Sequence, residues 1–213
     1  MNFWSFIVQN RTEIAELTLE HLWIVGIATL LAVVVGIPLG ILITRRPELH
    51  KPVIAAANII QTIPSLALFG FLLPAPWIGE RAARLAILAL MLYALLPLIR
   101  NTYAGIKGVD RAVVEAARGM GLTDRQLLLQ VELPLAASVI LAGVRVAIVT
   151  SIGLATIAAA IGAGGLGELI FRGLAMVNNA VILAGAIPAA LMALAADTLL
   201  GWLEKRLSPQ RAA

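Results

Sequence analysis

Three long stretches of this chain contain no charged residue, and they constrain its fold more than any other feature. They run from Leu22 to Thr44, from Pro52 to Gly79 and from Val146 to Gly167, and each reaches the roughly 20 residues with which a helix crosses a ~30 Å hydrocarbon core. Lipid offers the backbone no hydrogen bonds, so helices are the natural spanning structure. Charged residues make up 13% of the chain, against about a quarter in soluble domains. The sequence therefore predicts an all-α integral membrane protein.

Two further stretches are long enough to span, although each carries charge. One has arginines near both ends, Arg84 and Arg100, and the other contains Asp197. We therefore expect about five transmembrane helices in a single domain of residues 1–213. The expected spans are about 18–44, 52–74, 82–103, 134–160 and 178–203.

Residues 1–20 do not have the form of a cleavable signal peptide, because a basic start and a short apolar core are missing and three acids occupy the second half. They are more typical of an amphipathic helix that lies on the membrane surface. We expect Phe3, Trp4, Phe6 and Ile7 to point toward lipid.

The lysines and arginines indicate the orientation. With the N-terminus outside and the C-terminus in the cytoplasm, most cations between the spans fall on the inner side, as the positive-inside rule requires. The segment 109–133 is then cytoplasmic. The formal net charge of +4 reflects this topology, so it does not indicate a nucleic-acid partner. The cations expected inside are Arg45, Arg46, Lys51, Arg100, Lys107, Arg111, Arg118, Arg125, Lys205, Arg206 and Arg211.

The polar segment 109–133 predicts a helical hairpin between two spans. Gly119 and Gly121 weaken the first helix and permit a turn. Thr123, with Gln126 three residues later, has the form of a capping box that restarts the helix. Pro134 then opens the next span. The small residues of this hairpin suit close docking against another protein.

The same segment resembles the signature of permease subunits of binding-protein-dependent ATP-binding-cassette (ABC) importers. Glu115-Ala116-Ala117 is followed at the required spacing by Gly121, Val131 and Leu133-Pro134, and the only departure is Val131, where isoleucine is commoner. The resemblance implies a type I, methionine-permease-like fold in which this hairpin is the coupling helix that docks into a cytoplasmic ATPase subunit. The implied coupling residues are Glu115, Ala116, Ala117, Gly119, Gly121, Leu133 and Pro134.

Four further stretches resemble sequences found in the permeases of osmoprotectant importers. They are residues 61–65, 100–103, 161–167 and 185–188. This resemblance implies import of glycine betaine, choline or carnitine across the bacterial inner (cytoplasmic) membrane. Methionine permeases share the architecture and are the alternative. The implied partners are ATPase subunits, a second permease that is identical or homologous, and an extracytoplasmic solute-binding protein.

A polar patch in the second span is a candidate for the translocation path. Gln61, Thr62 and Ser65 surround Pro64, which removes a backbone donor and frees carbonyl groups. The alternative is that these side chains only join neighbouring helices, a common arrangement in membranes.

Arg145 and Asp197 lie at similar depth in the fourth and fifth spans, where an ionisable residue is costly unless it is paired or hydrated. We expect a salt bridge between them, the alternative being that Arg145 reaches the inner surface alone. In the first span, Gly36 and Gly40 form a GxxxG pattern that permits close helix packing, although such patterns also arise by chance.

Other functions find little support. The chain contains no G-x-x-x-x-G-K-[ST] sequence, so ATP hydrolysis is expected in a separate subunit and the chain is not expected to be an enzyme. Gly162, Gly164 and Gly167 follow a span rather than a strand, so we interpret them as a turn before a short helix from Leu166 to Met176, with an external gate as the alternative. With no cysteine and two separated histidines, no metal or cofactor is expected.

Two functions of other classes remain as alternatives. An intramembrane hydrolase using Ser65 or Ser151 lacks a base within the spans. A free-standing secondary transporter or channel commonly carries inverted repeats, and the sequence shows no convincing internal repeat.

Overall fold

The computed structural model describes residues 3–74 and 82–207, and within these ranges it contains helices and turns but no strand. Two 3₁₀ turns, η1 (Pro47–Leu49) and η3 (Ala159–Ile161), and one π-helical turn, η2 (Leu128–Glu132), accompany the α-helices. The α-helices are α1 (Phe3–Gln9), α2 (Arg11–Arg45), α3 (His50–Thr62), α4 (Ser65–Leu72), α5 (Ala82–Lys107), α6 (Arg111–Gly119), α7 (Asp124–Leu127), α8 (Leu133–Ala158), α9 (Gly167–Ala175) and α10 (Asn179–Leu207).

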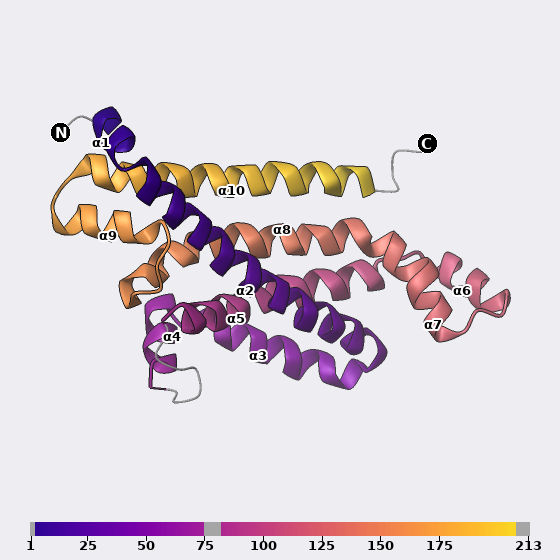
Figure 1. Ribbon diagram of the computed structural model, residues 1–213. Helices are drawn as coiled ribbons and strands as arrows, with labels where there is room; N and C mark the ends of the chain where they lie inside the picture. Colours follow the sequence, from indigo (N-terminus) through magenta and orange to yellow (C-terminus); the bar gives the residue numbers. More distant parts are fainter. Residues whose placement is uncertain (1–2, 75–81, 208–213) are drawn as a thin grey trace.

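The long helices α5, α8 and α10 run along the length of an elongated bundle, and α2 crosses them obliquely in the view of Figure 1. In the described part of the chain four helices are long and apolar enough to cross a membrane, or five if the bent pair α3 and α4 is counted as one span. The expected all-α membrane fold with about five spans is confirmed.

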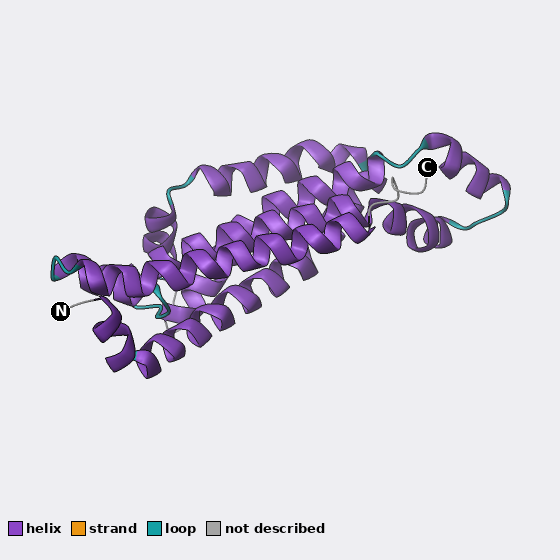
Figure 2. Cartoon of the chain, turned by 90° about the horizontal axis from the view of Figure 1, so that it is seen from above, coloured by secondary structure: helices purple, strands orange, loops and turns teal. Residues whose placement is uncertain are grey.

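The bundle has two distinct ends. The hairpin of α6 and α7 projects beyond the bundle at the end where α10 finishes, whereas α1 and α9 lie at the opposite end (Figures 1 and 2). We call these the hairpin end and the α9 end. Here α9 (Gly167–Ala175) matches the short helix predicted at residues 166–176.

The second expected span, 52–74, is not one straight helix. The axes of α3 and α4 meet at 99°, and Ile63 between them has an extended backbone with ψ of 126°. The cause is Pro64, which forces the preceding residue out of the α-helical region and cannot donate a backbone hydrogen bond. The polar patch therefore lies at a sharp bend.

The N-terminal region also differs from the expectation. Residues 11–20 do not form part of a separate surface helix, because α2 runs without interruption from Arg11 to Arg45. Phe6 is only 7% exposed and belongs to an apolar cluster with Leu17 and Leu169, so its expected position toward lipid is wrong. Trp4 is 74% exposed. An apolar pattern does not distinguish a lipid-facing side chain from one that packs on another helix.

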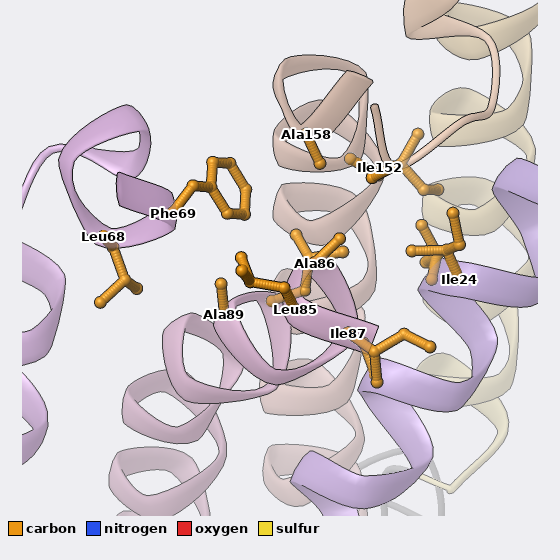
Figure 3. Packing of buried hydrophobic residues seen from close by; sticks show 14 residues of the cluster. Ile24, Leu68, Phe69, Leu85, Ala86, Ile87, Ala89, Ile152 and Ala158 are labelled. Atoms are coloured by element: carbon orange, nitrogen blue, oxygen red, sulfur yellow. The ribbon is translucent and has the colours of Figure 1, made fainter. Parts of the chain in front are cut away.

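The core between the helices is apolar and rich in small residues. Its largest cluster joins α2, α4, α5 and α8, and Phe69 of α4 is fully buried in it (Figure 3). The GxxxG pattern of α2 faces α5: a Cβ atom at Gly36 would lie 2.9 Å from Leu98 Cβ, and one at Gly40 would lie 2.5 Å from Thr102 Cβ. These glycines let α2 and α5 approach more closely than side chains would allow.

This contact predicts a sharp difference between two glycines of the same helix. Gly40→Ala forces its methyl group into Thr102, whereas Gly26→Ala enters open space with nothing within 4 Å. Overpacking of this kind costs about 1–3 kcal/mol. We expect the detergent-solubilised G40A variant to unfold at a lower temperature than the wild type, and G26A to match the wild type. Equal midpoints for the two variants would contradict the tight contact between α2 and α5.

Candidate functional site

The hairpin at the end of the bundle begins with a capped helix. The Asp110 carboxylate accepts a hydrogen bond from the Ala112 N–H group at 2.8 Å and caps α6. One turn later, Arg111 Nε donates to the Glu115 carboxylate at 2.9 Å. Both side chains of this pair are mostly exposed, so the pair adds little to stability. Glu115 is thus held on the outer surface of the hairpin.

The turn and the second helix of the hairpin follow the local sequence rules. Gly121 has φ of +85°, a conformation that favours glycine. The capping box is present: Thr123 Oγ1 accepts from the Gln126 N–H group at 3.4 Å, and Gln126 Oε1 accepts from the Thr123 N–H group at 2.9 Å. The chain therefore reverses direction at a fixed point.

The coupling residues expected from the sequence divide by exposure. Glu115, Ala116, Gly119 and Gly121 are exposed, whereas Ala117 is 2% exposed and supports the hairpin from within. Near the turn, Met120 is 75% exposed. An exposed surface with small and apolar residues at a helix turn is suited to docking against another protein.

The second helix of the hairpin is joined to the bundle without a break, whereas α6 is joined to α5 through the non-helical residues 108–110. From Asp124 the chain remains helical through α7, η2, α8 and η3 as far as Ile161. Leu133 and Pro134 begin α8 directly after the π-helical turn. At this root, both Arg45 terminal nitrogens donate to the Glu132 carboxylate, an ion pair that the sequence analysis did not anticipate. The second helix of the hairpin is therefore continuous with α8.

The polar patch at the α3–α4 bend is tied to α5. Gln61 Nε2 donates to the Tyr93 carbonyl at 2.9 Å, and the Tyr93 hydroxyl donates to the Ile63 carbonyl. Thr62 bonds a carbonyl of its own helix, that of Ile59, at 2.7 Å. These contacts satisfy carbonyl groups near the bend, so part of the patch has the joining role that was the alternative reading.

Gln61 also lines a polar hollow between α3, α5 and α8. The hollow has a volume of about 310 Å³, and Arg100, Asn101 and Thr150 contribute to it. Arg100 Nη2 donates to Asn58 Oδ1 at 2.8 Å. Thr62, Pro64 and Ser65 do not line this hollow. The sequence analysis used Arg100 for topology and for the resemblance of residues 100–103 to osmoprotectant permeases, but did not place it among the translocation-path residues.

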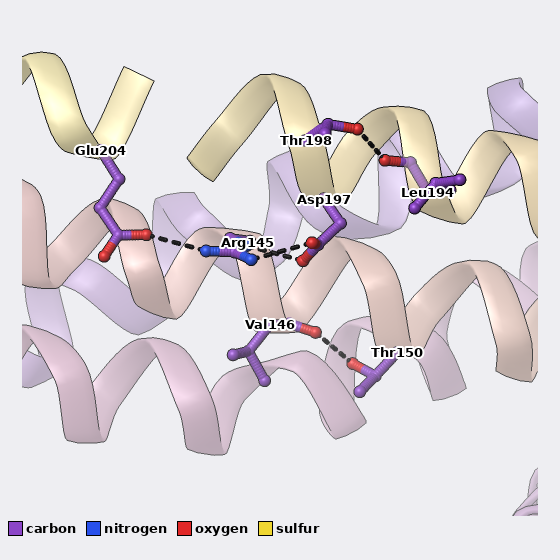
Figure 4. Close-up of polar contacts among 7 residues, drawn as sticks. All are labelled: Arg145, Val146, Thr150, Leu194, Asp197, Thr198 and Glu204. Atoms are coloured by element: carbon purple, nitrogen blue, oxygen red, sulfur yellow. Dashed lines mark hydrogen bonds and ion pairs between the residues drawn. The ribbon is translucent and has the colours of Figure 1, made fainter. Parts of the chain in front are cut away.

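A second polar cluster joins α8 to α10. Arg145 Nε and Nη2 donate to the two oxygens of Asp197 at 2.7 and 2.8 Å, and Nη1 donates to Glu204 at 3.2 Å (Figure 4). Gly201 lies between the two acids, and a Cβ atom there would be 3.1 Å from Arg145 Nη1. The structure thus brings Arg145 and Asp197 together and adds Glu204, which the sequence analysis did not single out although it lies two helical turns from Asp197.

The two polar sites are neighbours on one face of the bundle. A hollow of about 300 Å³ beside Arg145 shares Val146 and Thr150 with the hollow beside Gln61. The side chains of Arg145, Asp197 and Glu204 remain 34%, 41% and 32% exposed. We call this surface the polar face; its members are Gln61, Arg100, Asn101, Arg145, Thr150, Asp197 and Glu204.

The two histidines lie in different surroundings. His21 is fully buried, and its Nε2 lies 3.1 Å from the Ile152 carbonyl, to which it donates. His50 lies against Tyr103, with ring centroids 4.3 Å apart. Within the described residues no three histidine, cysteine or acidic side chains are grouped in a way that could hold a metal ion.

Known proteins are similar in sequence to this chain over nearly its full length. The chain is 48% identical over 206 residues to the glycine betaine/carnitine/choline transport system permease protein OpuCD of Bacillus subtilis, covering 96% of this chain and 89% of that protein. It is 44% identical over 206 residues to the carnitine transport permease protein OpuCB of Listeria monocytogenes, covering 97% and 93%. It is 42% identical over 207 residues to the osmoprotectant import permease protein OsmW of Salmonella typhimurium, covering 96% of each.

Solved structures share the fold. A chain of the MetNI methionine ABC transporter, in an inward-facing conformation, aligns with a TM-score of 0.81 at 23% identity, covering 89% of this chain and 93% of that one. An amino acid ABC transporter aligns with a TM-score of 0.80 at 20% identity, covering 97% and 99%. The expected type I permease fold is confirmed.

The family model described as the binding-protein-dependent transport system inner membrane component matches residues 36–209. That range contains the hairpin, its continuous connection to α8 and the whole polar face. The chain is thus a multi-pass membrane protein that belongs to the family of inner membrane components of binding-protein-dependent transport systems.

Proposed function

We propose that this chain is the membrane-spanning subunit of an ATP-driven importer whose solute is an osmoprotectant such as glycine betaine, choline or carnitine. The observation that carries the proposal is the exposed hairpin joined by continuous helix to α8, in a chain 42–48% identical to permeases named for these solutes. Methionine is less well supported, because the methionine transporter shares the fold at only 23% identity.

In this proposal the hairpin docks into a cytoplasmic ATPase subunit. Glu115, Ala116, Gly119 and Gly121 form the contact, while buried Ala117 maintains the shape of the hairpin. Leu133 and Pro134 transmit the movement because they start α8 directly behind the hairpin. ATP hydrolysis belongs to the partner, since the sequence contains no P-loop pattern.

The polar face provides the argument for a second permease. Ionisable side chains at membrane depth face protein or a water-filled cavity rather than lipid, and those of Arg145, Asp197 and Glu204 are each about a third or more exposed on this single chain. A second copy or a homologue therefore covers the polar face or encloses a path along it. Gln61 and Arg100 offer hydrogen bonds along that path.

The orientation follows from the docking partner. The hairpin end lies in the cytoplasm, and α9 lies on the outer side of the bacterial inner membrane, where the solute-binding protein delivers its cargo. The N-terminus is then outside and the C-terminus inside, which agrees with the distribution of lysines and arginines.

The solute is tested directly with the complex purified from its native membrane and reconstituted in vesicles with its binding protein. We expect ATP-dependent uptake of radiolabelled glycine betaine, choline or carnitine, and no uptake of radiolabelled methionine. Methionine uptake without osmoprotectant uptake would refute the proposed solute, and uptake by the chain without any ATPase would refute the importer assignment.

The docking role predicts that Glu115→Lys and Gly121→Leu leave the chain inserted but reduce ATP-driven uptake at least about tenfold, equivalent to ~1.4 kcal/mol. The lysine reverses the charge of the contact, and the leucine adds a side chain at a backbone conformation suited to glycine. The control is Glu48→Lys, the same reversal at an exposed acid outside the hairpin. If E115K and G121L transport as well as E48K, the hairpin is not the coupling element.

The ion cluster predicts non-additive effects. Arg145→Ala and Asp197→Ala each leave a charge at membrane depth without its main partner, so each is expected to lower the amount of chain in the membrane. In the double variant only Glu204 keeps an unpaired charge, whereas Arg145→Ala leaves both Asp197 and Glu204 unpaired, so the abundance of the double variant is expected to be no lower than that of Arg145→Ala. Quantitative immunoblotting of membranes measures the three levels, and purely additive losses would argue against an energetic coupling of the pair.

A further inference from the structure

Helix α2 is fastened at both ends by side chains that reach elements far away in the sequence. Its last residue, Arg45, binds the root of the hairpin, and two acids near its start, Glu13 and Glu20, bind α9 and the loop before it. The helix between them is unbroken. Glu13 and Arg45 are separated by about 48 Å of helix at ~1.5 Å per residue, so one element connects the two ends of the bundle.

At the hairpin end, the contact is an ion pair with one buried partner. The Arg45 guanidinium binds both oxygens of Glu132, whose side chain is only 6% exposed. Glu132 is the last residue of η2, directly before Leu133 and Pro134. A buried carboxylate depends on its partner much more than an exposed one does. Any displacement of the hairpin root therefore pulls on Arg45.

At the α9 end, the contacts hold a loop and a helix together. Arg172 Nη1 of α9 donates to Glu13 Oε1 at 2.7 Å, and the Gly165 N–H group donates to Glu20 Oε2 at 2.9 Å. The fit is close: a Cβ atom at Gly164 would lie 2.4 Å from the Glu20 carboxyl carbon. The glycine loop is thus shaped to receive this side chain.

These contacts matter because the backbone route to α9 is not rigid by itself. Between η3 and α9 the chain passes Gly162, Gly164 and Gly165, all with φ between +77° and +88°. Glycine has the greatest backbone freedom of all residues, so the loop backbone alone does not determine where α9 lies. Helix α9 also packs on α8 and α10: a Cβ atom at Gly167 would lie 2.1 Å from the Thr156 carbonyl oxygen, and one at Gly185 would lie 2.9 Å from Leu169 Cβ. By contrast, α2 is seated on α5 through Gly36 and Gly40, which supports the helix on both sides of Pro38.

We propose that α2 is a tie that carries movement of the hairpin to α9, with Arg45 and Glu132 as positioning residues at one end and Glu13 and Glu20 at the other. The inference rests on the proposed importer function and deepens it, because it names the route by which an ATPase at one end would alter the surface that receives the solute-binding protein at the other.

The test uses fluorescent labels on single cysteines, which are unique because the chain contains none. One label replaces Arg125 on the exposed side of α7, and the other replaces Leu174 on the exposed side of α9. In the complete complex with ATPase and binding protein, addition of ATP is expected to shift the emission of both labels. In Glu132→Gln, the label on α7 should still respond and the label on α9 should lose its response.

The matched control is Glu48→Gln, the same chemical change at an exposed acid near Arg45 that forms no ion pair among the described residues. The exchange R45E/E132R restores an ion pair and is expected to restore the response at α9. A merely structural role for Glu132 would weaken both labels together rather than separate them.

A second pair of variants tests the other end, which keeps the proposal falsifiable if E132Q does not assemble. Glu13→Gln combined with Glu20→Ala should abolish the ATP-induced emission shift of the α9 label alone. The control is Glu16→Gln, a change at an exposed acid in the same turns of α2, which should leave the emission shifts of both labels unchanged. An unchanged α9 response in E132Q or in E13Q/E20A overturns the tie and assigns transmission to α8 or α10. If ATP does not shift the α7 label in the unmodified chain, the coupling function itself fails.

Discussion

The structure depends on one constraint: hydrocarbon cannot form hydrogen bonds, so the backbone polar groups within the spans must be paired inside the protein. This constraint explains the long helices, whose backbone bonds are internal. It also explains why helices approach through small residues, as α2 does on α5 through Gly36 and Gly40. Where polar side chains remain at membrane depth, they gather on one face around Thr150 instead of scattering over the surface.

The two ends of the bundle are attached to its long helices in different ways. From Asp124 onward, α7, η2 and α8 form one continuous helical path, whereas α6 is joined to α7 by the turn at residues 120–123. The α9 end is attached through glycines with positive φ and takes its position from side-chain contacts.

Much of the fold could be predicted from the sequence because it depends on interactions between residues that are close together in the chain. Thr123 and Gln126 form the predicted capping box, and Gly121 adopts the turn conformation, because both depend on residues next to them in the chain. Three uncharged runs and two further apolar stretches with few charges were sufficient to predict about five spans. Similar depth in the membrane was enough to suggest that Arg145 and Asp197 meet.

Features that depend on packing between segments far apart in the chain could not be predicted from the sequence. The pairing of Arg45 with Glu132 joins residues 87 positions apart, and neither residue has a sequence pattern that points to the other. The sequence predicted one span over residues 52–74 and did not predict the 99° bend at Pro64, since proline predicts a break in a helix but not its angle. Phe6 was assigned to lipid because apolar periodicity does not reveal which apolar surface a side chain meets.

The most direct test of the central claim is a photoreactive amino acid placed at Ala116, on the exposed side of α6, in cells that carry the complete transporter. Illumination is predicted to crosslink this position to an ATPase subunit, identified by mass spectrometry, whereas the same group at Leu30, 62% exposed within the span of α2, should not. Absence of an ATPase crosslink at Ala116 in cells that still import the solute would contradict the account.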